Sequence, residues 1–205
     1  MTLCLVTDRR RRSVIEQCRD AVQAGVDLIQ VRERDLEGAA LSALTVELVR
    51  LSRATGTRVV VNERLDVALA CGADGVHLRG DSMSPERARS MAPAGFLIGR
   101  SVHGAEEAVQ AAPGADYLIA GTVFPTSSKP GLHECLGVEG LAVIVRAVSL
   151  PVLAIGGVSM DRIGAVAEAG AAGVAGIGVF LEEGAHLAAA VREARRRFDS
   201  VRSAS

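Results

Sequence analysis

Short apolar runs alternate with longer stretches of helical periodicity along the whole chain. The runs are nearly continuous in aliphatic residues, which is typical of parallel strands that are covered on both faces. They predict eight strands, at Leu3–Thr7, Leu28–Arg32, Arg58–Val61, Gly75–Leu78, Leu97–Ser101, Tyr117–Gly121, Val152–Gly156 and Gly173–Ile177. Between them, Ala, Leu and Val recur at helical spacing with charges in between. These stretches predict helices at Leu36–Ala54, Ser84–Met91, Ala105–Ala112, Val138–Val148, Ser159–Ala169 and His186–Phe198.

A short phrase recurs four times, each time after a predicted helix and before a predicted strand. It reads Gly25-Val26-Asp27, Gly72-Ala73-Asp74, Gly114-Ala115-Asp116 and Gly170-Ala171-Ala172. Glycine at such a position ends a helix in the left-handed conformation. The repetition indicates a repeating βα unit. Eight such units predict an α/β fold, a single (β/α)8 TIM barrel over residues 1–205. The alternative is an open doubly wound sheet, which is disfavoured because no Gly-x-Gly-x-x-Gly turn follows the first strand.

Composition narrows the class of protein. The chain has 205 residues, of which 49% are apolar and only 2% aromatic, so aliphatic residues must build the core. The scarcity of aromatic rings argues against a base-stacking surface, and the net charge of −1 predicts neither nucleic acid nor membrane as a partner. No signal peptide and no apolar run of membrane-spanning length is recognisable. The four cysteines are scattered, which favours reduced thiols and a cytoplasmic location.

Active sites of such barrels lie at the carboxyl ends of the strands, and phosphate sites favour the last two loops. Here the seventh predicted strand leads into Gly156-Gly157, and the eighth into Gly176-Ile177-Gly178. Glycines let a backbone approach an anion closely, and nearby helix N-termini direct N–H groups at it. We therefore expect a phosphate site at these residues. The alternative is that the glycines only relieve crowding.

Charged and polar residues follow the earlier strands. Gln30, Arg32 and Arg34 alternate, so we expect them on one face at the barrel mouth, where two guanidiniums suit a diphosphate. The alternative for Arg32 is a structural ion pair with a barrel carboxylate. Glu63 and Asp81 follow the third and fourth strands and could hold Mg²⁺ on a diphosphate, although such carboxylates are also common helix caps.

The longest irregular segment, residues 122–137, follows the sixth strand. A loop of this length in a compact barrel is usually functional or mobile. It carries Lys129, the only lysine of the chain, which we expect to act as an anion lid. Ser101, at the end of the fifth strand, could donate a hydrogen bond to the ligand. His133 and Cys135 are too few to indicate a metal site.

Taken together, these motifs resemble the thiamine phosphate synthase family, which includes the TenI-type thiazole tautomerases. The resemblance runs through nearly the whole chain in order. The residues that carry it are Gln30-Val31-Arg32-Glu33-Arg34, Val61-Asn62-Glu63-Arg64, Gly72-Ala73-Asp74-Gly75-Val76-His77, Gly99-Arg100-Ser101-Val102-His103, Gly121-Thr122-Val123-Phe124-Pro125-Thr126, Lys129 and Ile155-Gly156-Gly157.

The resemblance implies a reaction and a set of ligand contacts. The synthase joins an aminopyrimidine diphosphate to thiazole phosphate through a pyrimidine methylene cation and releases pyrophosphate. By resemblance, the diphosphate is held by Gln30, Arg32 and Arg34, and the released pyrophosphate also by Ser101 and Lys129. The remaining substrate contacts are implied at Asn62, Thr122, Thr126, Gly156, Gly157, Gly176, Ile177 and Gly178. Small phosphate and diphosphate substrates are thus the expected partners, with a homodimer as the assembly that the resemblance allows.

The sequence also departs from the family pattern at the reaction end of the site. Glu63 stands where the family has its first Mg²⁺ aspartate, and Ser82 where it has the second, with Asp81 one residue away. Mg²⁺ at Glu63 and Asp81 is nevertheless the expected cofactor. Synthase chemistry ranks first because the diphosphate cations and Asn62 are retained. A TenI-type tautomerase ranks second; Thr122 replaces its catalytic histidine, so His103 or His133 would have to move the proton. A non-catalytic barrel that binds thiazole or thiamine phosphate ranks third.

Overall fold

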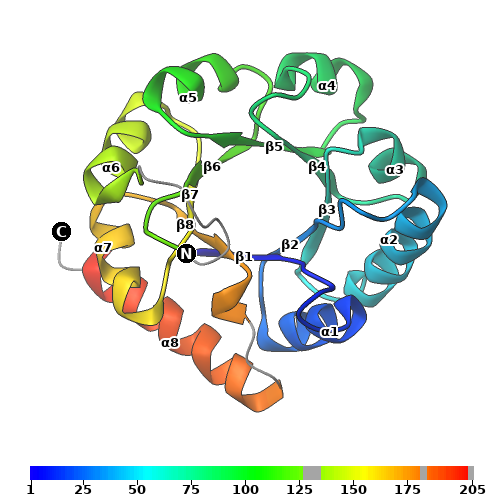
Figure 1. Cartoon of the computed structure of the whole chain (residues 1–205), viewed down its shortest axis with the longest axis horizontal. Coiled ribbons are helices and arrows are strands. Elements are labelled where there is room, and N and C mark those ends of the chain that lie inside the picture. The colour runs from blue at the N-terminus through cyan, green and yellow to red at the C-terminus, as the bar shows by residue number, and fades with distance from the viewer. Residues whose placement is uncertain (127–134, 181–183, 203–205) are drawn as a thin grey trace.

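Eight parallel strands close into a barrel in the computed structural model, which describes residues 1–126, 135–180 and 184–202. The strands pair in chain order, and β1 closes the barrel against β8 through the register Leu3↔Val174. The helices form a ring outside the strands (Figure 1). The predicted TIM barrel is confirmed, and the open doubly wound sheet is excluded.

The observed elements lie within a few residues of those that the apolar pattern predicts. The strands are β1 (Thr2–Val6), β2 (Leu28–Val31), β3 (Arg58–Asn62), β4 (Gly75–Leu78), β5 (Leu97–Val102), β6 (Tyr117–Gly121), β7 (Val152–Ile155) and β8 (Gly173–Gly176). The helices are α1 (Val14–Ala24), α2 (Gly38–Ser52), α3 (Leu65–Ala70), α4 (Pro85–Met91), α5 (Ala105–Ala111), α6 (Gly137–Ala147), α7 (Ile163–Glu168) and α8 (Gly184–Arg202), with short 3-10 turns η1 (Met160–Arg162) and η2 (Gly178–Phe180). Helices α1 and α3 add to the six stretches predicted from periodicity.

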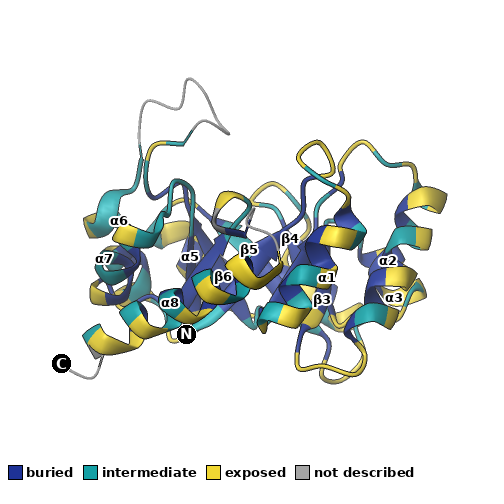
Figure 2. Cartoon of the chain, turned by 90° about the horizontal axis from the view of Figure 1, so that it is seen from below, coloured by how far each residue is buried: buried dark blue, intermediate teal, exposed yellow. Residues whose placement is uncertain are grey.

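The core has two parts, because successive strand residues point to opposite faces of the sheet. The larger part lies between the strands and the helices and includes Leu3, Leu5, Ile29 and Val61. The smaller part fills the barrel interior; its members are Cys4, Val6, Leu28, Val60, Tyr117, Ile119, Leu153 and Ala175. Figure 2 shows the buried strands at the centre and the exposed outer faces of the helices. None of the helices described has the length and apolar character needed to cross a membrane.

The recurring phrase performs the same structural task in each quarter of the barrel. Its four glycines, Gly25, Gly72, Gly114 and Gly170, all have left-handed φ angles of 79°, 65°, 80° and 83°. The aspartate that follows lies just before an even-numbered strand, and its carboxylate accepts a backbone N–H of the preceding odd-numbered strand. The pairs are Asp27 with Leu3, Asp74 with Val59 and Asp116 with Ile98, each at 2.7 Å. In the fourth quarter Ala172 stands in place of the aspartate and has no carboxylate. Its backbone carbonyl accepts the Thr2 N–H at 2.9 Å. The repeating unit is thus a pair of βα units.

Replacing Asp74 with alanine is expected to lower the free energy of unfolding by about 1–2 kcal/mol, because the Val59 N–H loses its carboxylate acceptor. For a chain of this size that corresponds to a melting temperature about 2–8 °C lower, measurable by thermal unfolding. Asp74→Asn keeps an acceptor oxygen and should lose less. An unchanged melting temperature in Asp74→Ala would contradict the capping role.

Candidate active site

A buried group of polar side chains occupies the barrel interior near the carboxyl ends of the strands. Strand register places Asn62 beside His77, and His77 beside Gly99. The Gln30 amide donates to Asn62 Oδ1 at 2.9 Å. Nε2 of His77 lies 2.8 Å from Ser101 Oγ. The predicted residues Gln30, Asn62 and Ser101 are therefore brought together inside the barrel.

Tyr117 completes this group, which we call the polar floor: Gln30, Asn62, His77, Ser101 and Tyr117. The Tyr117 hydroxyl lies 3.3 Å from His77 Nδ1, and both side chains are buried. Gly99 makes the contact possible, because a Cβ at that position would overlap both the Tyr117 ring and His77 Nδ1. His77 and Tyr117 were not predicted as site residues. A signal was present in the sequence, since each is a polar ring at an inward position of an otherwise apolar strand.

The polar floor is held in its uncharged form. Burial, with smaller contributions from Arg100 and Arg32, lowers the pKa of His77 from 6.5 to about 3. Burial also raises the pKa of Tyr117 well above its ordinary value. At neutral pH one ring nitrogen of His77 donates and the other accepts, as in any neutral imidazole. The floor is therefore suited to hydrogen bonding with a neutral ligand group and not to holding a charge.

The buried His77 makes stability depend on pH in a defined direction. Between pH 6.5 and 3 the unfolded chain binds a proton at this residue that the folded chain does not, so the free energy of unfolding falls as pH falls through this window. The slope from one such group is at most about 1.4 kcal/mol per pH unit. We expect His77→Gln to show a shallower loss of stability between pH 6.5 and 4.5 in urea unfolding. Equal slopes for the two proteins would contradict this assignment.

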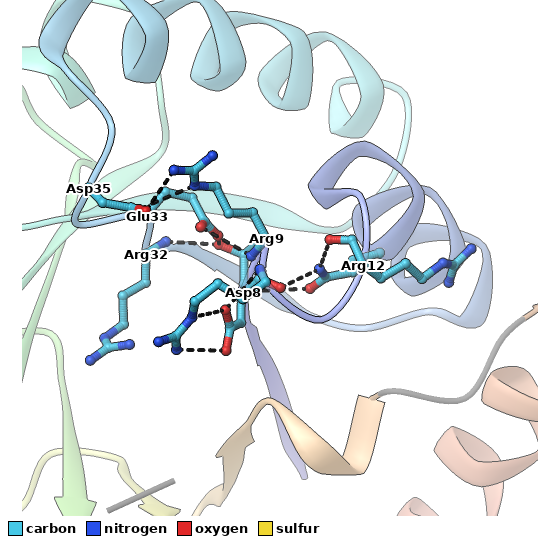
Figure 3. A network of polar contacts seen from close by, with 9 residues as sticks. Asp8, Arg9, Arg12, Arg32, Glu33 and Asp35 are labelled. Carbon is cyan, nitrogen blue, oxygen red and sulfur yellow. Dashed lines mark hydrogen bonds and ion pairs between the residues drawn. The ribbon is translucent and has the colours of Figure 1, made fainter.

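Arg32 lies close to the polar floor and is half-buried. Burial, followed by the neighbouring cations Arg34 and Arg10, lowers the pKa of its guanidinium. In the part of the chain that the structure describes, no carboxylate pairs with this group, so the predicted alternative of an ion pair is not found. In Figure 3 its side chain runs out of the surrounding network, and no dashed line reaches the guanidinium. A desolvated, unpaired cation at the mouth is a binding element for an anion.

The segment that carries Arg32 is fixed by a network between the first two loops (Figure 3). Thr7 Oγ1 donates to Glu33 at 2.6 Å and accepts from the Arg32 backbone N–H at 2.9 Å. Arg9 pairs with Asp35 at 2.6 Å. Glu33 therefore accepts hydrogen bonds within the network, whereas the Arg32 side chain takes no part in it. Among the four consecutive arginines at positions 9–12, Arg10 pairs with Asp8 and Arg12 with Asp20.

Arg34 is exposed, and its predicted place on one face with Gln30 and Arg32, like its role in holding the diphosphate, stays a prediction. Strand β2 ends at Val31, so the alternation of faces does not continue as far as Arg34. Its exposed side chain lines a cleft together with Val31 and Glu33, whose side chains belong to the outward face. The cleft nevertheless reaches the mouth at Asn62, which lines it as well.

The two carboxylates predicted for Mg²⁺ are both engaged by Arg79. Glu63, with a left-handed φ of 66°, accepts the Arg79 backbone N–H at 2.5 Å. Asp81 pairs with the Arg79 guanidinium at 2.6 Å. Arg100 fixes the loop by donating to the carbonyl of Gly80 at 2.7 Å. No group of three or more His, Cys, Asp or Glu side chains forms a metal cluster among the described residues. Glu63 is thus held by a backbone N–H and Asp81 by a guanidinium, and Mg²⁺ binding at these two residues stays a prediction.

The glycines of the predicted phosphate site fall into two kinds. A Cβ on Gly156 would overlap Thr122, and one on Gly157 would overlap the carbonyls of Phe124 and Pro125, so both relieve crowding against the loop after β6. Among the described residues, a Cβ on Gly176 or Gly178 would have no atom within 4 Å. Open space for a phosphate therefore exists beside Gly176-Ile177-Gly178. The phosphate-binding role itself remains a prediction for all of these residues.

The remaining predicted residues occupy different surroundings. Thr122 is buried behind Gly156, and Thr126 is half-buried at the last described position before the gap. Lys129 and His133 lie outside the described residues. His103 is exposed and lies 3.1 Å from Glu107 through Nδ1. The histidine placed inside the barrel is instead His77, which no tautomerase motif had indicated.

Comparison with known proteins agrees with this geometry. A family model described as thiamine monophosphate synthase matches residues 3–180. The thiamine-phosphate synthase of Methanoregula boonei is 42% identical over 192 residues, which cover 93% of this chain and 88% of that protein. A solved structure, thiamine phosphate pyrophosphorylase from Pyrococcus furiosus, matches with a TM-score of 0.86 and 37% identity, covering 98% of this chain and 96% of the other. A 3-hexulose-6-phosphate synthase matches with a TM-score of 0.70 at 22% identity, which speaks for the barrel fold alone.

Proposed function

The chain belongs to the thiamine monophosphate synthase family, and on this basis we propose that it is a thiamine-phosphate synthase. It joins an aminopyrimidine diphosphate to thiazole phosphate and releases pyrophosphate. The observation that carries the proposal is Arg32, a half-buried cation at the barrel mouth that has no counterion among the described residues. Such a group is costly to desolvate unless an anion binds to it. The diphosphate of the substrate is the anion that the family's reaction supplies.

The polar floor suits the aminopyrimidine ring. An aminopyrimidine presents ring nitrogens that accept and an amino group that donates hydrogen bonds. Gln30 and Asn62, beside the neutral His77 and Ser101, offer both kinds of partner in a buried setting. A site built to hydrogen-bond a ligand discriminates strongly against analogues that lack those groups. Binding the ring here would leave its diphosphate within the region of Arg32.

The main chemical requirement of this reaction is to stabilise the negative charge that develops on the leaving diphosphate. The C–O bond to the diphosphate breaks and the electron pair stays on the diphosphate oxygen, so negative charge develops there. Preorganised cations and hydrogen-bond donors lower that barrier without any general base. We assign this role to Arg32, with Ser101 and Lys129 as further pyrophosphate contacts. The uncharged floor does not add a proton to the departing diphosphate, which fits ionisation without acid catalysis.

The second substrate, thiazole phosphate, needs a site for its phosphate group. Its ring nitrogen must also reach the methylene carbon of the pyrimidine. We place the thiazole phosphate against the backbone at Gly176-Ile177-Gly178, after β8, which is separated from β2 only by β1. Gly156 and Gly157 contribute by letting the loop after β6 pack closely against the seventh strand. The thiazole nitrogen then forms the new C–N bond at the methylene carbon. Homodimer formation and a cytoplasmic location stay predictions.

The test is direct formation of product. The protein is incubated with the pyrimidine diphosphate and thiazole phosphate, with and without Mg²⁺, and thiamine phosphate is followed by chromatography. We expect time-dependent product with one pyrophosphate released per thiamine phosphate. No product above the rate without protein, under both conditions, would overturn the proposal. Isomerisation of the thiazole carboxylate phosphate tautomer in place of condensation would support the tautomerase instead.

A further inference from the structure

Three members of the polar floor form a continuous chain of hydrogen bonds inside the barrel. The Tyr117 hydroxyl lies 3.3 Å from His77 Nδ1, and His77 Nε2 lies 2.8 Å from Ser101 Oγ. Strand register aligns Tyr117 with Gly99 and Gly99 with His77, so the two rings lie at one level of the barrel. Ser101 is half-buried and lies two residues farther along β5, toward the carboxyl ends of the strands. The chain therefore has a deep end at Tyr117 and an outer end at Ser101.

The deep end of this chain is enclosed by apolar side chains. Tyr117 is 7% exposed and packs in the barrel interior with residues such as Cys4, Val6 and Leu153. Within the part of the chain that the structure describes, His77 Nδ1 is the one hydrogen-bond partner of the Tyr117 hydroxyl. Burial raises the pKa of this phenol well above its ordinary value, so the phenol keeps its proton. The acceptor for that proton must therefore be Nδ1.

The enclosed phenol fixes the direction of the other bonds. A neutral imidazole carries one proton, so one ring nitrogen donates and the other accepts. When Nδ1 accepts from Tyr117, Nε2 donates to Ser101 Oγ, and the Ser101 hydrogen points away from the ring. In the reverse direction, the Tyr117 hydrogen would be buried without an acceptor, which costs the desolvation of that donor. Burial, with smaller contributions from Arg100 and Arg32, lowers the pKa of His77 to about 3, so the doubly protonated ring does not form at neutral pH.

We propose that Tyr117 and His77 are positioning residues that commit the Ser101 hydroxyl to donate its hydrogen bond toward the leaving diphosphate. The inference rests on the proposed function, in which Ser101 contacts the diphosphate. Each of the three groups keeps its own proton, and the chain sets only the direction of the hydrogen bonds. A donor fixed in advance stabilises the transition state more than the bound substrate, because the diphosphate oxygen becomes more negative as the C–O bond breaks. Tyr117 thus influences the reaction without touching a substrate.

The tautomer of His77 tests the direction of the chain in the protein without substrate. The protein is labelled with ¹⁵N at histidine and studied by NMR at neutral pH, and His77→Gln identifies the His77 signals by removing them. We expect a proton on Nε2 and the chemical shift of an unprotonated nitrogen at Nδ1. Tyr117→Phe keeps the ring but removes the donor, so the second tautomer should become populated and the two nitrogen shifts should approach each other. A proton on Nδ1 in the parent protein, or an unchanged tautomer in Tyr117→Phe, would overturn the proposal.

A double-mutant cycle on thiamine phosphate formation tests whether Tyr117 acts through Ser101. Tyr117→Phe should lower kcat about three- to tenfold, the range expected for one hydrogen bond. The KM for the pyrimidine diphosphate should change by less than about twofold, because the lost effect belongs to the transition state. Adding Tyr117→Phe to Ser101→Ala should lower kcat no further, since the hydroxyl that Tyr117 orients is already absent. Two losses that multiply would refute a role of Tyr117 through Ser101.

Thr57→Val is the matched control. It removes another buried hydroxyl, which donates to the Val26 carbonyl at 2.6 Å just before β3, at the opposite end of the barrel. We expect a lower melting temperature, with kcat and the His77 tautomer unchanged. An equal loss of kcat in Thr57→Val and Tyr117→Phe would assign the effect to lost stability and overturn the positioning role. Failure of the proposed function is distinguishable, because the parent would then form no thiamine phosphate while its His77 tautomer still reports the direction of the chain.

Discussion

Replacing Arg32 with methionine is expected to lower kcat/KM for thiamine phosphate formation by about 10²–10³-fold, the usual cost of removing one preorganised group that stabilises developing charge. Arg32 is a half-buried cation close enough to the polar floor to act on His77, and no ion pair to its guanidinium is found in the described part of the chain. Methionine preserves the apolar stem and removes the charge. Steady-state kinetics with both substrates measure the loss.

The stability of Arg32→Met should not fall together with its activity. Burial and the nearby cations Arg34 and Arg10 lower the pKa of Arg32, so the folded chain holds its charge at a cost. The melting temperature of Arg32→Met should therefore equal or exceed that of the parent. Arg32→Lys should recover only part of the activity, because a point charge does not reproduce a planar fork. The control Arg19→Met, at an exposed position of α1, should leave both readouts unchanged. Activity of Arg32→Met within about threefold of the parent would remove this residue from the site.

The fold could be predicted from the sequence because its signals are local. An apolar run reports a buried parallel strand without knowledge of its partners, and the Gly-x-Asp phrase reports one helix end and one strand start. The eight apolar runs then give the number of units. Even the hydrogen bonds of Asp27, Asp74 and Asp116 repeat from one quarter of the barrel to the next. Local regularity was sufficient to specify the closed barrel.

The alternation of side chains along a strand predicted the position of site residues only within the strands themselves. Alternation correctly placed Gln30 on the inward face with the neighbouring Asn62. It does not place Arg34, since β2 ends at Val31 and the alternation of faces ends with the strand. A run of alternating residues does not show where the strand that produces it will end. The diphosphate contact of Arg34 therefore stays a prediction.

Contacts between distant segments account for what the sequence did not reveal. His77 meets Tyr117 across 40 positions of the chain, through the register of three strands. Gly156 and Gly157 are required by the loop after β6, which packs where their side chains would be. Arg79 captures Asp81, two residues away, in a loop whose shape depends on Arg100 of the next strand. None of these partners is indicated by the residue types alone.

Gly99→Ala is expected to damage both stability and activity, because the added methyl group would occupy the space in which His77 and Tyr117 meet. Overpacking of a filled interior costs about 1–3 kcal/mol, which for this chain length is a melting temperature lower by about 2–12 °C. Displacement of His77 from Ser101 should also lower kcat/KM, since the pyrimidine end of the site would lose its fixed geometry. The control Gly56→Ala adds a methyl group where no atom lies within 4 Å and should cost nothing.

A double-mutant cycle separates this specific clash from a general intolerance of side chains in β5. Tyr117→Ala removes the ring that the new methyl group would meet, so Gly99→Ala should cost much less in that background than in the parent. The coupling free energy should be favourable and on the order of 1–2 kcal/mol, as found for residues that share one packed space. Activity should stay low in the double variant, because the His77–Tyr117 contact is absent in it. If the two melting-temperature losses simply add, Gly99 is not reserved for this contact. The polar floor would then have to be held by the strands alone.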